Sequence, residues 1–270
     1  MFEASSPIGI FDSGMGGLTV AKAVTQQLPS ESIVYFGDTA HAPWGDKSVA
    51  AIQAYAVKIC DILLHQHCKL ILIACNSASA VAYDLVKEYV GHRVTVIDVV
   101  NPMVDYLATH YSKKRVGLIG TQQTVGSDIY GKKIQQRGIA IRFNALATPL
   151  LVPLIESGER NPKVIEEVIK SYLLSPQLQN IDALVLGCTH YPLIKDQINA
   201  FYSGQTAVID ATEMVAKAVK NQLQAQDLLA SAGQLPQRTF YSSDYTQAFS
   251  ALARRFFDEP VRLERYALWD

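Results

Sequence analysis

Two cysteines stand in similar surroundings in different parts of the chain, and a thiol can transfer protons, react as a nucleophile or bind a metal. Cys75 lies in the segment ACNSASA (residues 74–80), and Cys188 lies in GCTHYPL (residues 187–193). Each thiol follows an apolar run that predicts a strand and precedes a segment that predicts a helix. Because a helix N-terminus lowers the pKa of a thiol from about 8.5 towards neutrality, we expect both thiols to be reactive. A single buried cysteine is more often a small core residue, but two at matching strand ends favour a function.

Three kinds of chemistry could use such a pair. A redox dithiol usually has Cys-x-x-Cys spacing, whereas these two cysteines are far apart in the sequence. A metal site needs more ligands than His190 alone provides near Cys188. The third possibility is the inversion of a stereocentre by two bases, in which one thiolate removes the α-proton of an amino acid and a thiol on the opposite face returns one. A pair of equivalent groups that face each other favours this third chemistry.

The glycine-rich segment FDSGMGGL (residues 11–18) joins a predicted strand to a predicted helix. Its glycines let backbone amides approach a ligand closely, and a helix N-terminus favours anions, whereas Asp12 favours an ammonium group. The third glycine of a dinucleotide fingerprint would fall at Thr19, and no P-loop lysine follows. The segment therefore indicates either a site for a zwitterion such as an amino acid or a tight turn in which Asp12 caps the helix.

Strand and helix patterns alternate along nearly the whole chain, which predicts an α/β fold with central parallel sheets flanked by helices. Two similar units repeat, and each presents a cysteine at the carboxyl end of a strand, where open parallel sheets bind their ligands. The expected strands cover residues 8–12, 33–36, 70–74, 94–97, 116–119, 139–143, 183–186, 207–209 and 239–241. The expected helices cover residues 18–28, 49–67, 79–90, 103–111, 126–137, 162–174, 192–201, 212–225 and 245–257.

Composition and charge exclude several classes of protein. The 270 residues include 24 Lys+Arg and 25 Asp+Glu, a formal net charge of −1, so the chain lacks the basic excess of a nucleic-acid-binding protein. The apolar run at residues 70–75 is far shorter than the roughly 20 residues of a membrane-spanning helix. The first residues lack the pattern of a signal peptide, and the four cysteines do not form a disulfide framework, so we expect a cytoplasmic protein.

These motifs together resemble those of the glutamate racemases, a branch of the cofactor-independent aspartate/glutamate racemase superfamily. The resemblance covers nearly the whole chain and is carried by residues 8–14, 37–40, 74–80, 152–156 and 187–193. It implies two related α/β domains with pseudo-twofold symmetry and the active site between them. The first domain would be discontinuous, and the second would be inserted into it, with bounds at residues 1–98 plus 211–270 and at residues 99–210. The resemblance further implies interconversion of L- and D-glutamate for peptidoglycan synthesis, without a cofactor or metal, by a homodimer.

The resemblance also implies roles for individual residues. Cys75 would be the base toward D-glutamate and Cys188 the base toward L-glutamate. Asp12 and His190 would assist these two thiols, and Glu156 would support His190. The substrate would contact Asp12, Ser13, Trp44, Gly45, Asn76, Ser77, Thr121, Thr189 and His190.

The chain departs from the family pattern at several positions. Trp44 and Ser77 stand where tyrosine and threonine are usual, so we expect the affinity for substrate to differ. Asp98 leads a segment that usually begins with glycine, and Thr148 replaces a commoner cysteine. The short segment before Asp12 predicts no activation by a peptidoglycan precursor.

Two alternatives to glutamate racemisation stay open at this point. The first is a racemase of the same superfamily that acts on aspartate or a related amino acid, which the pocket contacts at Trp44 and Ser77 would distinguish. The second is a non-catalytic regulatory protein that binds an amino acid on the same scaffold. The presence of both cysteines together with Asp12 and His190 argues against this second alternative.

Overall fold

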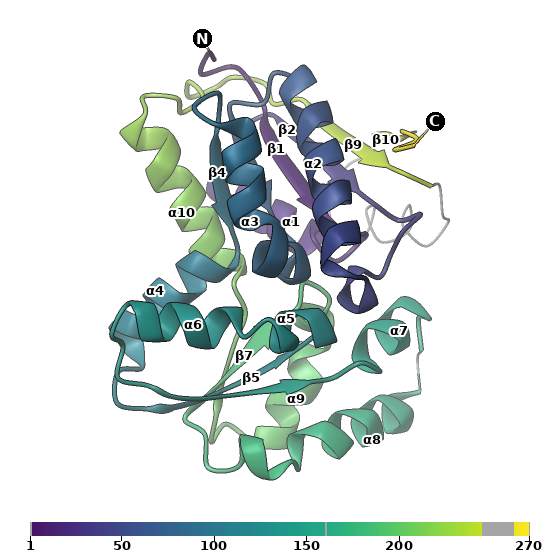
Figure 1. The fold of residues 1–270 in the computed structure, drawn as a ribbon, viewed down its shortest axis with the longest axis vertical. Coiled ribbons are helices and arrows are strands. Elements are labelled where there is room, and N and C mark those ends of the chain that lie inside the picture. The colour runs from purple at the N-terminus through teal and green to yellow at the C-terminus, as the bar shows by residue number, and fades with distance from the viewer. Residues whose placement is uncertain (1, 160, 245–261, 270) are drawn as a thin grey trace.

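Two parallel β-sheets, each flanked by helices, make up the computed structural model, which describes residues 2–159, 161–244 and 262–269 (Figure 1). The larger sheet has the strand order β10-β9-β2-β1-β3-β4, and the smaller sheet has the order β6-β5-β7-β8. All of the strand pairings are parallel. The predicted α/β class is therefore confirmed.

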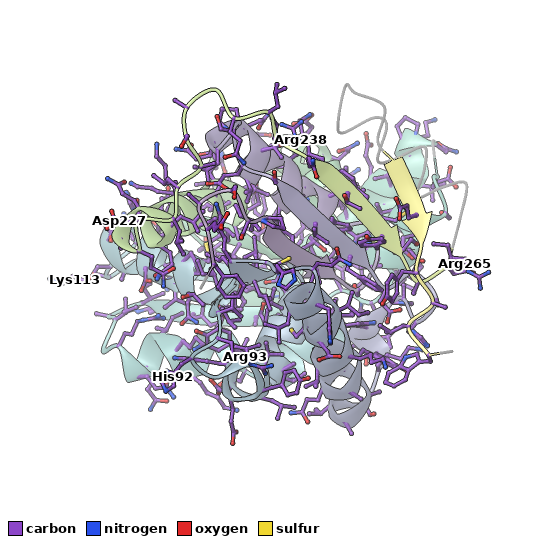
Figure 2. The ribbon with its side chains drawn as sticks, turned by 90° about the horizontal axis from the view of Figure 1, so that it is seen from above. His92, Arg93, Lys113, Asp227, Arg238 and Arg265 are labelled. Carbon is purple, nitrogen blue, oxygen red and sulfur yellow. The ribbon has the colours of Figure 1, made fainter. Side chains whose placement is uncertain are left out.

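The larger sheet combines strands from the two ends of the described chain. Figure 2 shows its last two strands side by side at one edge, with Arg238 at the start of β9 and Arg265 at the end of β10. Its strands are β1 (Ile8–Asp12), β2 (Ile33–Gly37), β3 (Leu70–Ile73), β4 (Thr95–Asp98), β9 (Arg238–Ser242) and β10 (Arg262–Arg265). The strands of the smaller sheet are β5 (Arg115–Gly120), β6 (Arg142–Ala147), β7 (Ala183–Gly187) and β8 (Ala207–Ile209).

Alternation along β1 explains why helices are needed on both faces of the larger sheet. Ile8 and Ile10 belong to a buried cluster with residues of α1 (Leu18–Gln27) and α10 (Thr212–Ala225), whereas Phe11 belongs to a cluster with residues of α2 (Val49–His65) and α3 (Asn76–Val90). The remaining helices are α4 (Val100–His110), α5 (Gln122–Gly126), α6 (Ile129–Gln136), α7 (Leu151–Glu156), α8 (Pro162–Leu173) and α9 (Lys195–Tyr202).

The strand order bears out the predicted repeat. The order β6-β5-β7-β8 of the smaller sheet matches the order β2-β1-β3-β4 within the larger one. Cys75 follows β3 and Cys188 follows β7, so the two cysteines occupy equivalent places in the two sheets. The domain bounds at residues 98/99 and 210/211 stay a prediction.

Several elements differ from their predicted bounds. The helix expected at residues 126–137 is observed as α6, which begins only at Ile129 because Asp128 before it has a left-handed φ of 53°. Strand β6 begins later than expected because α6 ends in a Schellman motif. In this motif the amide of Ile139 donates to the carbonyl oxygen of Ile134, and Gly138 has a φ of 62°. Helix α7 and strand β10 were not among the predicted elements. The helix expected at residues 245–257 lies outside the described residues.

Candidate active site

Both predicted cysteines line one cavity between the two sheets. Cys75 is the N-cap residue of α3, Cys188 directly follows β7, and only 4% and 6% of their surfaces are exposed. The cavity is narrow, with a volume of about 20 Å³. Every predicted substrate contact except Asp12 lines this cavity: Ser13, Trp44, Gly45, Asn76, Ser77, Thr121, Thr189 and His190. Pro43 and Val152 also line it, and the sequence analysis did not predict these two residues.

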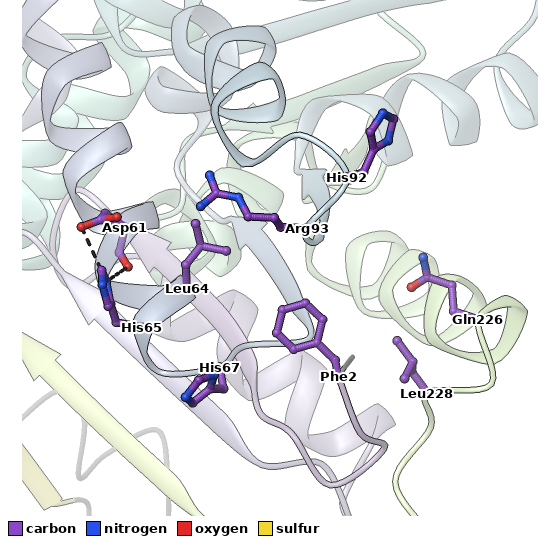
Figure 3. Close-up of a pocket in the computed structure, with 9 residues that line it drawn as sticks. All are labelled: Phe2, Asp61, Leu64, His65, His67, His92, Arg93, Gln226 and Leu228. Atoms are coloured by element: carbon purple, nitrogen blue, oxygen red, sulfur yellow. Dashed lines mark hydrogen bonds and ion pairs between the residues drawn. The ribbon is translucent and has the colours of Figure 1, made fainter.

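A wider hollow lies elsewhere, beside the amino ends of β1, β3 and β4. Figure 3 shows its nine lining residues, which include Phe2, His65 and Arg93 and none of the predicted site residues. Figure 2 places His92 and Arg93 together on the periphery of the molecule. Within the described ranges, no group of three His, Cys, Asp or Glu side chains is arranged to hold a metal ion. The convergence of both cysteine turns, rather than the size of a hollow, therefore identifies the candidate site.

Cys188 begins a chain of polar contacts with His190 and Glu156. Its Sγ lies 3.8 Å from His190 Nδ1, and His190 Nε2 lies 2.9 Å from Glu156 Oε1. Burial lowers the pKa of His190, but its hydrogen bonds with Cys188 and Glu156 and the negative charges of Cys188 and Asp12 together raise this pKa to about 10. His190 is thus cationic near neutral pH and lies in contact with the Cys188 sulfur.

Cys75 has a different electrostatic environment. Burial and the charge of Asp12 raise the pKa of Cys75 to about 12, although hydrogen bonds with the Ala78 amide and the Ser13 side chain act in the opposite direction. The expectation that a helix N-terminus brings the thiol pKa towards neutrality is therefore wrong for Cys75, because burial outweighs the helix. After Cys188 the expected helix begins late: the 3-10 turn Tyr191–Ile194 follows first, and α9 begins only at Lys195.

Asp12 is fully buried at the end of β1 and connects the glycine-rich turn to the Cys188 turn. Its Oδ2 accepts hydrogen bonds from the amides of Gly14 and Gly17, both at 3.0 Å, and its Oδ1 accepts one from the Thr189 hydroxyl at 3.3 Å. Gly17 is the N-cap residue of α1, so the turn uses these amides to hold Asp12. Asp12 therefore uses the amides of a tight turn, as one of the two interpretations predicts, while Ser13 of the same segment lines the cavity.

Hydroxyl and glycine contacts join the two halves of the cavity wall. Ser77 Oγ lies 2.8 Å from Thr121 Oγ1, and Thr121 is the N-cap residue of α5. A Cβ atom at Gly45 would lie 2.8 Å from the Cβ of Thr121, so only glycine allows this close approach. These contacts hold the loop at Gly45 and the N-terminus of α3 against the N-terminus of α5.

Asp38 supports the wall at Trp44, a function that sequence reasoning did not assign to it. It is fully buried, and its two carboxylate oxygens accept hydrogen bonds from Trp44 Nε1 at 3.1 Å and from Ser243 Oγ at 2.7 Å. Trp44 therefore lines the cavity with its N–H donor already used. The sequence could not show this role of Asp38, because its partner Ser243 lies far from this loop in the sequence.

The family model described as Asp/Glu/Hydantoin racemase matches residues 17–219. The chain belongs to this racemase family. It is 43% identical over 257 residues to a glutamate racemase of Chlorobaculum parvum, covering 94% of this chain and 93% of that protein. The solved structure of a glutamate racemase from Francisella tularensis in complex with D-glutamate is similar with a TM-score of 0.88 and 36% identity, over 98% of both chains. A glutamate racemase isoform from Bacillus anthracis is similar with a TM-score of 0.92 and 30% identity, over 98% of both chains.

Family membership makes the protein an isomerase of the amino-acid racemase class. None of the helices in the described part of this racemase is both long enough and apolar enough to cross a bilayer.

The packing of the racemase at Gly16 leads to a first prediction. A Cβ atom there would lie 2.4 Å from Thr189 Oγ1 and 2.6 Å from His190 Nδ1. Gly16→Ala should therefore displace His190 and lower kcat/KM by about 100-fold, as small misplacements of active-site groups do. The matched control is Gly14→Ala, where the new Cβ meets only Ala42 at 3.5 Å. Similar steady-state losses for both variants would contradict the proposed packing effect.

The raised pKa of His190 predicts how the stability of the racemase depends on pH. Its folded pKa of about 10 lies above the ordinary value of 6.5, so its stabilising contribution is complete below pH 6.5 and is lost as the pH rises to about 10. The difference in unfolding free energy between wild type and His190→Asn should therefore shrink over this interval. Urea unfolding of both proteins at several pH values measures it, and a difference that stays constant would contradict the assignment.

Proposed function

We propose that this racemase interconverts L- and D-glutamate by a two-base mechanism in which Cys75 and Cys188 exchange the α-proton without a cofactor. The observation that carries the proposal is that both thiols line one closed cavity, each at the end of an equivalent strand. Their surroundings differ in the way that a two-base reaction requires. One cysteine must be a thiolate and the other a thiol when each turnover begins.

The environments suggest which thiol begins as the base. Cys188 lies beside a cationic His190, whereas burial and the charge of Asp12 keep Cys75 protonated. In the forward direction the Cys188 thiolate removes the α-proton of L-glutamate, so a C–H bond breaks and an S–H bond forms. The Cys75 thiol then gives its proton to the opposite face of the carbanion, which forms D-glutamate and leaves Cys75 as the thiolate. The reverse reaction uses the same groups in opposite roles.

The cavity wall supplies groups that can stabilise the carbanion. The α-hydrogen of an amino acid is far less acidic than a thiol, so the charge that develops in the transition state needs fixed hydrogen-bond donors. Asn76, Ser77, Thr121 and Thr189 all line the cavity. Because the Thr121 and Thr189 hydroxyls donate to Thr124 and Asp12, the amide group of Asn76 is the side-chain donor that we assign to a substrate carboxylate. Because Asp12 accepts from Thr189 and raises the pKa of Cys75, we assign it to the support of both thiols.

The biological setting is part of the same proposal. The curated and structural relatives described above are glutamate racemases, and we propose that this enzyme likewise supplies D-glutamate for peptidoglycan synthesis in the cytoplasm. We also propose a homodimer with the domain bounds given above. Light scattering of the purified protein measures the mass, and a monomer at working concentration would contradict the dimer.

A substrate panel tests the choice of glutamate. Purified protein is incubated separately with L-glutamate and L-aspartate, and the loss of optical rotation is followed. We expect kcat/KM for glutamate to exceed that for aspartate by at least about 100-fold, since a missing methylene misplaces the second carboxylate. A preference for aspartate would contradict the substrate. Binding of glutamate without any racemisation would favour the regulatory-protein alternative.

A further inference from the structure

Tyr130 on α6 reaches across from the smaller sheet to a residue of the active-site cavity. Its hydroxyl donates a hydrogen bond to Asn76 Oδ1 at 2.8 Å. Asn76 is the first residue of α3, which packs in the other half of the molecule, and it lines the cavity beside Cys75. Only 2% of Tyr130 and 4% of Asn76 are exposed, so water does not compete for this hydrogen bond.

The direction of this hydrogen bond fixes the orientation of the Asn76 amide. An asparagine side chain has an oxygen that only accepts and an NH₂ group that only donates. Tyr130 occupies the oxygen, which leaves the Nδ2 group of Asn76 as the end available to a ligand. Burial and the charge of Asp98 raise the pKa of Tyr130 far above its ordinary value, so its hydroxyl keeps the proton that it donates.

Helix α6 and the residue that caps its C-terminus contact α3 of the other half and the neighbouring helix α4. Tyr130, Lys133 and Arg137 follow helical spacing. The Lys133 Nζ lies 5.7 Å from the ring centroid of Tyr83 on α3. Arg137 Nη2 donates to Asn101 Oδ1 on α4 at 2.9 Å. The Tyr130 hydroxyl therefore has a fixed position relative to the cavity.

The ring of Tyr130 is fixed independently of its hydroxyl. It stacks on Phe143 of β6 with the ring centroids 6.3 Å apart and an interplanar angle of 21°. A phenylalanine at position 130 would keep this stacking and lose only the hydrogen bond to Asn76. The contribution of the hydroxyl can therefore be measured separately from that of the ring.

We infer that Tyr130 is a positioning residue that presents the Asn76 amide group as a hydrogen-bond donor to a substrate carboxylate. The inference rests on the proposed amino-acid substrate and adds to it a residue from the opposite half of the molecule. Without the hydroxyl, the amide is free to turn its oxygen towards the substrate, and an oxygen facing a carboxylate repels it. Tyr130 thus acts on substrate affinity, and it does not touch the reacting atoms.

Tyr130→Phe is the direct test. We expect KM for both enantiomers of glutamate to rise about tenfold, the usual scale for one lost hydrogen bond that orders a binding group, with kcat within about threefold of wild type. The matched control is Tyr106→Phe on α4, whose ring stacks on His110 and does not line the cavity. This control should keep the wild-type KM. An unchanged KM for Tyr130→Phe would overturn the inference.

A double-mutant cycle distinguishes positioning from a general structural effect. If Tyr130 acts through Asn76, Tyr130→Phe should have no further effect on KM once Asn76→Ala is present. If the two effects multiply instead, Tyr130 acts independently of Asn76 and the inference is wrong. Wild type is measured first in each series. A wild type that neither binds nor racemises glutamate would refute the proposed function itself, whereas a normal wild type with an unaffected Tyr130→Phe refutes only this inference.

Discussion

Cys188→Ala should abolish racemisation while leaving proton exchange on one face of the substrate. Racemisation should slow by about 10⁴-fold, the upper end of what a positioned acid–base group contributes. Cys75 still faces the cavity in this variant, so it can remove and return the α-proton of D-glutamate without inversion. In D₂O, D-glutamate should therefore gain α-deuterium while its optical rotation is unchanged. Cys75→Ala should show the mirror behaviour with L-glutamate.

The chain provides matched controls for these two variants. Cys60 and Cys68 are also buried free cysteines, but they belong to a core cluster and do not line the cavity. Cys60→Ala and Cys68→Ala should lower stability and leave kcat unchanged, because each removes only a small core side chain. Racemisation by Cys188→Ala at the wild-type rate would contradict the assignment of this thiol as a base.

Removal of the cation beside Cys188 should produce the second large effect. His190→Asn should lower kcat/KM by about 100-fold, because the Cys188 thiolate loses the imidazolium at 3.8 Å. The two enantiomers have equal free energies, so kcat/KM must fall equally in both directions. The alkaline limb of the pH–rate profile that reports deprotonation of His190, whose pKa is raised to about 10, should be lost in this variant.

Glu156→Gln refines this prediction. It keeps the shape of the residue that contacts His190 Nε2 at 2.9 Å and removes its charge. We expect a smaller loss of kcat/KM and a shift of the same limb instead of its loss. Glu159→Gln is the control, because Glu159 does not contact His190 and its side chain is exposed. A profile of His190→Asn that superimposes on wild type after scaling would contradict the role of the cation.

Sequence patterns were sufficient to find candidate site residues where these residues lie in short local motifs. Cys75 and Cys188 each lie in a short segment between a strand and a helical element, so position and residue type could both be inferred. The repeat in the strand order followed from the same segments. Asp12 was also found, although its amide partners were first assigned to a ligand.

Contacts between distant segments could not be predicted in this way. The hydrogen bond from Tyr130 to Asn76 and the one from Ser243 to Asp38 depend on how the elements are placed in three dimensions, and a helical period does not specify that placement. The pKa of Cys75 was predicted in the wrong direction for the same reason. Burial, which sets that pKa, arises only when the two sheets close over the thiol.

The isotope content of the first product tests the two-base account most directly. L-glutamate with protium at the α-carbon is incubated with wild type in D₂O, with EDTA and no added cofactor, and the reaction is stopped at low conversion. Two bases on opposite faces predict D-glutamate that carries deuterium at the α-carbon, because its new proton comes from a different thiol, while the remaining L-glutamate keeps its protium. D-glutamate that retains the original protium would show that a single base carries the proton across, and it would contradict the roles of Cys75 and Cys188.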